Sequence, residues 1–111
     1  MPYDRDLANL LRELLADVDG IAEKAMFGGL AFLLNGNIAI AASGQGGLLV
    51  RVNPELADAS AARPHASIAV MRGRQMPGWI RVAAEGTRLR RQLEPWVRRS
   101  LDYVRTLPPK G

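Results

Sequence analysis

Two glycine turns divide the middle of the chain into short apolar runs. Leu30–Leu34 is followed by Asn35-Gly36, and Ile38–Ala41 is followed by the glycine-rich stretch 43–47, after which Leu48–Val52 is again apolar. Asn-Gly between two apolar runs predicts a two-residue hairpin with positive φ at both residues. Links this short cannot make the crossover that parallel strands need. The middle of the chain therefore folds as an antiparallel sheet, with a further strand expected from Ile21 onward.

Helical patterns lie on both sides of this segment. Apolar residues recur at helical spacing in the first part of the chain, and Asp4 or Asp6 suits the start of a helix that we expect to end near Ala16. Asn53-Pro54 predicts the start of a short second helix, because asparagine caps a helix and proline is tolerated at the first helical position. That helix ends near residues 63–64.

The last part of the chain predicts two strands and a third helix. Residues 66–71 and 79–82 are the expected strands, with 72–78 as their connection. Pro95 lies inside the third helix and predicts a kink or a break, since an interior proline removes one backbone hydrogen bond. We expect the inner stripe of this helix to be Leu89, Leu93, Trp96, Val97, Ser100, Leu101 and Val104, with fraying at Lys110-Gly111.

The predicted fold is a single α+β domain over residues 1–111, an antiparallel sheet flanked by helices in the order α-β-β-β-β-α-β-β-α. A chain of 111 residues is the usual size of one domain. Strands such as Leu30–Leu34 are apolar at successive positions, so both faces of the sheet need to be covered. Three short helices do not supply enough surface to cover both faces. We therefore expect a homodimer formed through the sheet or its edge.

Composition excludes several classes of function. The chain has no cysteine and one histidine, His65, so neither a thiolate site nor a histidine metal cluster can form within it. The glycines of 43–47 lead into a strand and not a helix, which favours a hairpin turn over a phosphate-binding loop. We predict no catalytic residue, no cofactor and no metal. Without a membrane-length apolar run or a signal-peptide pattern, the expected location is the cytoplasm.

Charge is divided unevenly along the chain. Residues 1–60 carry four bases and eight acids, whereas residues 61–111 carry eleven bases and three acids. A basic half suggests an anionic partner, but thirteen of the fifteen bases are arginine, which a GC-rich coding sequence would also produce. The candidate contacts for an anion or nucleic acid are Arg72, Arg74, Arg91, Arg98 and Arg105.

Four short motifs stand out in the chain. They are Glu23–Phe32 followed by Asn35-Gly36, Leu49–Val52, Gly73-Arg74 with Met76 and Gly78, and Leu107–Lys110. Together they resemble the N-terminal domain of the TfoX/Sxy family. The resemblance implies an antiparallel sheet flanked by helices, similar to secretion-chaperone-like folds, and supplies no catalytic residues. Longer members regulate natural competence together with a cyclic-AMP receptor protein and carry a second domain. The motif residues expected to be structural are Met26, Phe27, Gly28, Gly29, Gly36, Gly73, Arg74, Met76 and Gly78, with Phe27 more buried than Met26.

The sequence thus favours a non-enzymatic interaction or regulatory module whose partner is another protein or a second copy. Two alternatives remain at this stage. One is direct binding of nucleic acid by the five candidate arginines, which is not favoured. The other is a small-ligand protein or enzyme, which would need a pocket near Gly28, Gly29 and Arg74 with a buried polar group.

Overall fold

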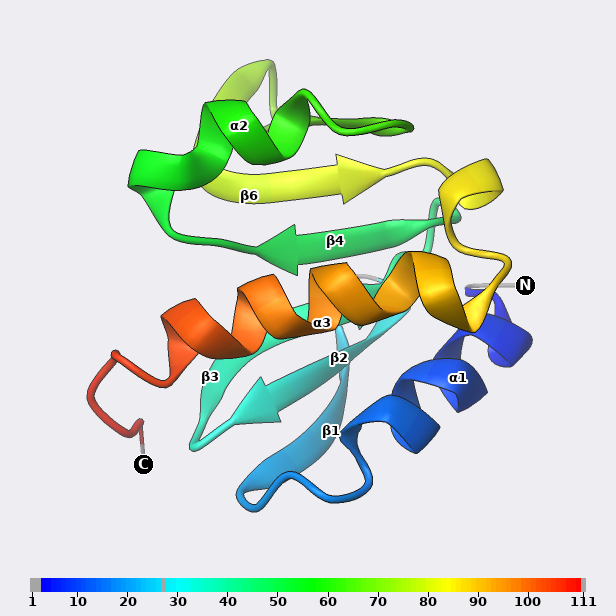
Figure 1. The fold of residues 1–111 in the computed structure, drawn as a ribbon, viewed down its shortest axis with the longest axis vertical. Helices are drawn as coiled ribbons and strands as arrows, with labels where there is room; N and C mark the ends of the chain where they lie inside the picture. Colours follow the sequence, from blue (N-terminus) through cyan, green and yellow to red (C-terminus); the bar gives the residue numbers. More distant parts are fainter. Residues whose placement is uncertain (1–2, 27, 111) are drawn as a thin grey trace.

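The computed structural model describes residues 3–26 and 28–110, which form one six-stranded antiparallel sheet with three α-helices (Figure 1). The chain order is the predicted α-β-β-β-β-α-β-β-α, and the strands lie in the order β1-β2-β3-β4-β6-β5. The elements are α1 (Arg5–Leu15), β1 (Ile21–Met26), β2 (Gly29–Leu34), β3 (Asn37–Ala42), β4 (Leu48–Arg51), η1 (Pro54–Leu56), α2 (Ala57–Ala61), β5 (Ala66–Met71), β6 (Arg74–Val82), η2 (Ala84–Gly86) and α3 (Arg90–Val104).

The predicted helix starts are confirmed by their caps. The Asp4 carboxylate accepts the backbone N–H groups of Asp6 and Leu7 at 2.9 and 3.2 Å, which satisfies donors that the first turn of α1 leaves free. The Asn53 side chain accepts the amide of Glu55 at 2.9 Å. The segment after Asn53 is a 3₁₀ turn, η1, that continues into α2.

The Asn35-Gly36 hairpin joins β2 to β3 as predicted. Asn35 has φ 52° and Gly36 has φ 85°, the two positive values of a type I′ turn. The same strand pair contains a bulge before the turn, where the register shifts between Phe32 and Leu33.

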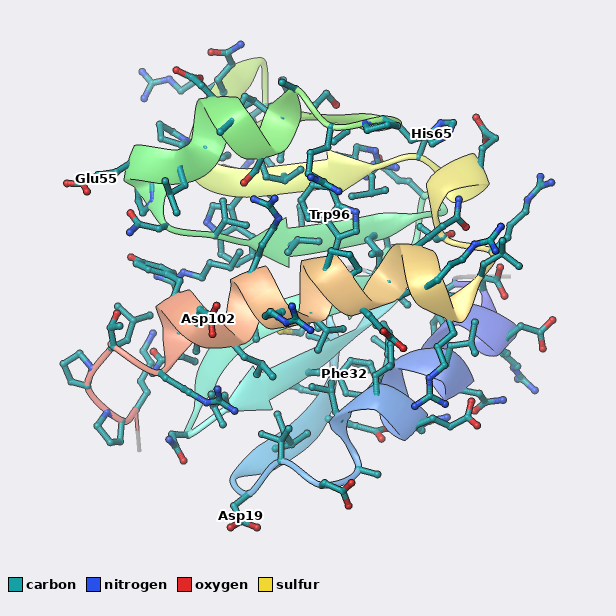
Figure 2. The ribbon with its side chains drawn as sticks, in the orientation of Figure 1. Asp19, Phe32, Glu55, His65, Trp96 and Asp102 are labelled. Atoms are coloured by element: carbon teal, nitrogen blue, oxygen red, sulfur yellow. The ribbon has the colours of Figure 1, made fainter. Side chains whose placement is uncertain are left out.

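The core lies on one side of the sheet. A continuous row of paired residues crosses it through Phe32, Ile40, Val50 and Ile80, and each of these side chains is at most 1% exposed. Helices α1 and α3 cover the part of this face around β3 and β4, and α2 covers β5 and β6. Figure 2 shows Phe32 among the side chains below α3, whereas Asp19 and Glu55 point away from the molecule. One apolar layer therefore holds all three helices to one face.

The connection between the last two strands differs from the prediction. β6 begins at Arg74, so Arg72-Gly73 alone forms the turn, with φ 53° and 75°. Pro77 and Gly78 are strong turn signals, but they lie inside β6 where the register with β5 shifts. An irregularity of this kind accepts a proline and a positive-φ glycine that a regular central strand would not.

Leu89 was wrongly expected in the inner stripe of the third helix, and of the kink or break expected at Pro95 the break does not occur. Leu89 precedes α3 in an extended conformation and is 46% exposed, so it does not belong to the inner stripe. Pro95 does not break the helix, which continues to Val104. The remaining six members of the stripe are buried. Pro95 costs a single hydrogen bond near the start of the helix, and the packed stripe outweighs that loss.

The expectation for Phe27 falls outside the described residues. Its neighbour Met26 is partly buried at the end of β1.

Candidate binding face of the sheet

The side of the sheet opposite the core carries a second row of paired residues. Since neighbours along a strand point to opposite faces, the row through Ala31, Ala41, Leu49 and Arg81 projects away from the core. Figure 1 shows the three described helices on the other side. We call this surface the open face; its residues are Lys24, Met26, Ala31, Leu33, Ile38, Ala41, Leu49, Arg51, Trp79 and Arg81. It is therefore an apolar sheet surface with cationic residues among its members.

A shallow apolar hollow of about 190 Å³ lies on the open face. We call it the methionine hollow, because Met26, Met71 and Met76 line it from three different strands, together with Trp79. The complete lining is Met26, Gly29, Ala31, Ile38, Ala41, Ala42, Ser43, Gly44, Leu49, Met71, Met76 and Trp79. Methionine is flexible and polarisable, so a surface built from it adapts to differently shaped apolar groups.

A second hollow, of about 530 Å³, is cationic. We call it the basic hollow; its lining is Lys24, Met26, Leu33, Gly36, Asn37, Ile38, Arg51, Trp79 and Lys110. Three of these residues carry positive charge and none is acidic. The two hollows share Met26, Ile38 and Trp79, so they adjoin each other on the same face.

Aromatic rings orient Arg51. Its guanidinium carbon lies 5.4 Å from the centroid of the Trp79 ring and 5.8 Å from that of the Tyr103 ring. Both distances are within the range of cation–π attraction. Trp79 is the cross-strand partner of Arg51, and Tyr103 comes from α3. The charge of Arg51 is thus held beside the basic hollow by two separate elements.

The C-terminal segment brings Lys110 to the same hollow. The Lys110 backbone N–H donates to the Asn35 carbonyl at 2.7 Å, and the Asn37 side-chain amide donates to the Pro108 carbonyl at 2.9 Å. A side chain at Gly36 would overlap the Lys110 carbonyl. The fraying expected at Lys110-Gly111 is therefore wrong for Lys110, because a hydrogen bond holds this residue to the hairpin turn, and Gly111 lies outside the described residues.

The five candidate arginines occupy two separate places. Arg72 lies in the turn between β5 and β6, Arg74 opens β6, and both are exposed at that end of the hairpin. Arg91, Arg98 and Arg105, which we call the α3 arginines, are exposed on α3, which packs on β3 and β4. Two acidic residues, Glu94 and Asp102, lie among the α3 arginines. The Glu94 Oε1 atom is 3.5 Å from Nε of the neighbouring Arg90. The fold does not collect the five side chains around either hollow.

The glycine-rich stretch 43–47 is a hairpin turn, as predicted. Its ends are joined by a hydrogen bond of 2.9 Å from the Ser43 N–H to the Gly47 carbonyl. Arg81 donates to the Ser43 hydroxyl at 3.3 Å and to the Gly46 carbonyl at 3.2 Å. Arg81 therefore fixes this loop to the open face, and the loop leads into β4 and not into a helix.

Four of the motif residues behind the family resemblance line the hollows of the open face. Met26, Gly29 and Met76 line the methionine hollow, and Gly36 lines the basic hollow. Gly28 precedes β2 with φ 78°, and Gly78 lies in the irregular part of β6. Gly73 belongs to the turn between β5 and β6, and Arg74 is the first residue of β6. Neither hollow includes Gly28 or Arg74 in its lining, and the buried amide of Asn37 already has a partner.

An exposed ion pair between Arg12 and Glu23 shifts the pKa values of both side chains. The Arg12 guanidinium donates to both carboxylate oxygens of Glu23 at 2.8 Å and joins α1 to β1. These hydrogen bonds hold the pKa of Glu23 below its ordinary value and raise the pKa of Arg12. This pair is structural and lies on the helix side of the sheet.

The described part of the chain contains no group of three or more His, Cys, Asp or Glu residues that could hold a metal ion. Within that same part, no helix combines the length and the apolar character needed to cross a membrane.

Sequence reasoning missed the basic hollow. Lys24 and Met26 alternate on one strand, as do Leu49 and Arg51 on another, and this spacing indicates that each pair shares a face. Nothing in the local pattern indicates that Lys110 joins them, because that contact depends on the return of the C-terminal segment to the Asn35-Gly36 turn.

Comparison with known families yields a match over most of the chain. Searches of curated proteins and of solved structures found no significant similarity. The model of the TfoX N-terminal domain matches residues 13–104, which include every strand of the sheet, all of α3 and the last turn of α1. The chain belongs to the TfoX N-terminal domain family.

Proposed function

We propose that this chain is a non-enzymatic interaction module, with a regulatory role like that of TfoX/Sxy N-terminal domains, and that a partner protein docks on the open face. The observation that carries the proposal is the methionine hollow, an apolar site on a sheet face opposite the helices. Apolar surface gathered in one place on a folded domain marks an interaction site. The adjoining basic hollow adds cations to this apolar surface, a combination that suits binding.

The charges on the open face favour a different protein over a second copy. In a symmetric face-to-face dimer, Lys24, Arg51 and Arg81 would lie against a surface carrying the same charges. Like charges brought together at an interface cost free energy. The partner that complements this face presents apolar side chains together with negative charge.

A homodimer through the outer edge of β5 remains a separate prediction. Val70 and Met71 on this strand are 58% and 44% exposed, and an unpaired edge is a template for strand pairing. Light scattering at high micromolar concentration checks it. Twice the mass of one chain supports the dimer, and the mass of one chain rejects it.

The test of the proposed function compares two leucine substitutions. Leu49→Asp places a carboxylate in the methionine hollow, whereas Leu56→Asp makes the same change at a residue that is 54% exposed and lines neither hollow. Tagged wild-type protein and both variants are purified from the native cell, and the proteins that accompany them are identified. Circular dichroism confirms that each variant is folded.

We expect a partner that accompanies the wild type and Leu56→Asp and is absent with Leu49→Asp. The recombinant partner then binds the purified wild type directly in calorimetry. Identical partners with Leu49→Asp and with the wild type would contradict docking on the open face.

A further inference from the structure

We infer that the basic hollow binds a carboxylate of the docked partner, so that the partner segment carries an acidic residue beside apolar side chains. This inference rests on the proposed function and adds the chemistry of the partner. It assigns a role to Lys24, Arg51 and Lys110, whose combination the sequence pattern does not reveal.

Three cationic residues from distant parts of the chain line this hollow. Lys24 comes from β1, Arg51 from the end of β4 and Lys110 from the C-terminal segment. Salt bridges between described residues involve Arg12 with Glu23 and Arg90 with Glu94, and none of the three cations. No acidic side chain is among the described residues that line the hollow, so these like charges repel one another and an incoming anion relieves that repulsion.

Arg51 is oriented for such a contact. Its planar group lies over the Trp79 and Tyr103 rings, and no described residue accepts a hydrogen bond from it. Stacking uses the face of a guanidinium and leaves the N–H groups at its edge free to bind a carboxylate in bidentate fashion.

The position of Lys110 is also fixed. Hydrogen bonds hold the C-terminal segment to both sides of the hairpin turn, from the Lys110 N–H to Asn35 and from Asn37 to Pro108. The absence of a side chain at Gly36 permits this close approach. The hollow is therefore shaped before any ligand arrives, which lowers the ordering cost of binding.

The adjoining methionine hollow indicates a protein segment as the ligand. Because the two hollows share Met26, Ile38 and Trp79, one bound segment can place an apolar side chain in the first and a carboxylate in the second. A nucleic acid presents a phosphate at every step along its backbone and gains little from a hollow lined by three methionines. Nucleic acid is accordingly an outcome of the test and not the proposal.

The experiment uses a phage-displayed library of random 12-residue peptides as the probe. It is selected on the full-length wild-type protein, and the best peptide is then synthesised with a fluorescent label. Anisotropy gives its affinity for the wild type, for Lys24→Gln/Arg51→Gln and for Arg91→Gln/Arg98→Gln. The last variant is the matched control, because it removes the same charge from the outer surface of α3.

We expect selected peptides to combine Asp or Glu with apolar residues. The Lys24→Gln/Arg51→Gln variant should bind about 10- to 150-fold more weakly, the range for loss of a charge-assisted hydrogen bond, and the control should bind as the wild type does. A peptide in which Asn or Gln replaces the acidic residue should no longer distinguish the variants. The Lys24→Gln/Lys110→Gln variant, which keeps the stacked Arg51, should also bind the peptide more weakly than the wild type.

The other outcomes separate the two proposals. Selected peptides without acidic residues, with unchanged affinity for Lys24→Gln/Arg51→Gln but none for Leu49→Asp, would overturn the carboxylate site and leave the proposed function standing. If the selection yields no peptide whose binding depends on Leu49, both proposals are contradicted. Displacement of the peptide by an oligonucleotide that loses affinity in Lys24→Gln/Arg51→Gln would overturn the carboxylate assignment in favour of nucleic acid.

Discussion

Replacement of Gly36 by alanine tests whether the hairpin turn holds the C-terminal segment. The new Cβ would overlap the Lys110 carbonyl, and the backbone has φ 85° at this position. Gly46 is the matched control, because its φ is 90° and a Cβ there meets nothing within 4 Å. Both substitutions strain the left-handed backbone by about 1–2 kcal/mol, but only Gly36→Ala displaces the C-terminal segment.

The magnitude follows from the hydrogen bonds that the displaced segment loses. They are the bonds from Lys110 to Asn35 and from Asn37 to Pro108. Each contributes about 0.5–1.5 kcal/mol to stability. Gly36→Ala should therefore lower the free energy of unfolding by about 1–3 kcal/mol more than Gly46→Ala does. Urea denaturation measures this difference, provided that the slope of the unfolding free energy against urea concentration is the same for both variants.

Deletion of residues 108–111 completes the test as a double-mutant cycle. Without the segment, Gly36→Ala and Gly46→Ala should be destabilised equally. Equal destabilisation in the full-length chain, or a difference that survives the deletion, would refute the reasoning that the turn and the C-terminal segment stabilise each other.

Three further predictions concern the core, the ion pair and the α3 arginines. Phe32→Ala should lower the free energy of unfolding by about 3–5 kcal/mol in urea, because this large side chain belongs to the core row and is only 1% exposed; unchanged midpoints would contradict this packing. The pKa of Glu23 is lowered in the folded state, so its contribution is present above the unfolded pKa and is lost as the pH falls through the folded pKa. Stability measured from neutral to acidic pH should fall less steeply in Glu23→Gln than in the wild type, and parallel curves would reject the linkage. Labelled duplex and single-stranded DNA should show negligible binding at physiological salt, whereas submicromolar affinity lost on replacement of the α3 arginines by glutamine would support the nucleic-acid alternative.

Local signals in the sequence predicted most of the fold. Asp4 and Asn53 specify helix starts through hydrogen bonds within three residues, and Asn35-Gly36 specifies a turn through its own backbone preference. Each depends only on neighbours in the chain. Such elements can be predicted before any tertiary contact is known.

The errors arose where tertiary packing outweighs a local preference. Pro77 and Gly78 predicted a loop, but the pairing of β6 with β4 and β5 accommodates them in an irregular strand. Pro95 remains inside α3, whose inner stripe is buried on both sides of it.

The candidate site was the least predictable part. The sequence directed attention to the many arginines of the second half, whereas the basic hollow draws Lys24 and Arg51 from the acidic half. Net charge along a sequence does not specify which side chains meet on one surface.

Photocrosslinking from the open face tests the central claim most directly. A benzophenone amino acid replaces Leu49 in one protein and Leu56 in another, and both are irradiated in the native cell. The account predicts a covalent adduct with the partner protein from position 49 and none from position 56, with weaker crosslinking when Lys24→Gln/Arg51→Gln is added. A partner adduct from position 56 alone, or only adducts between copies of this chain, would contradict docking of a different protein on the open face.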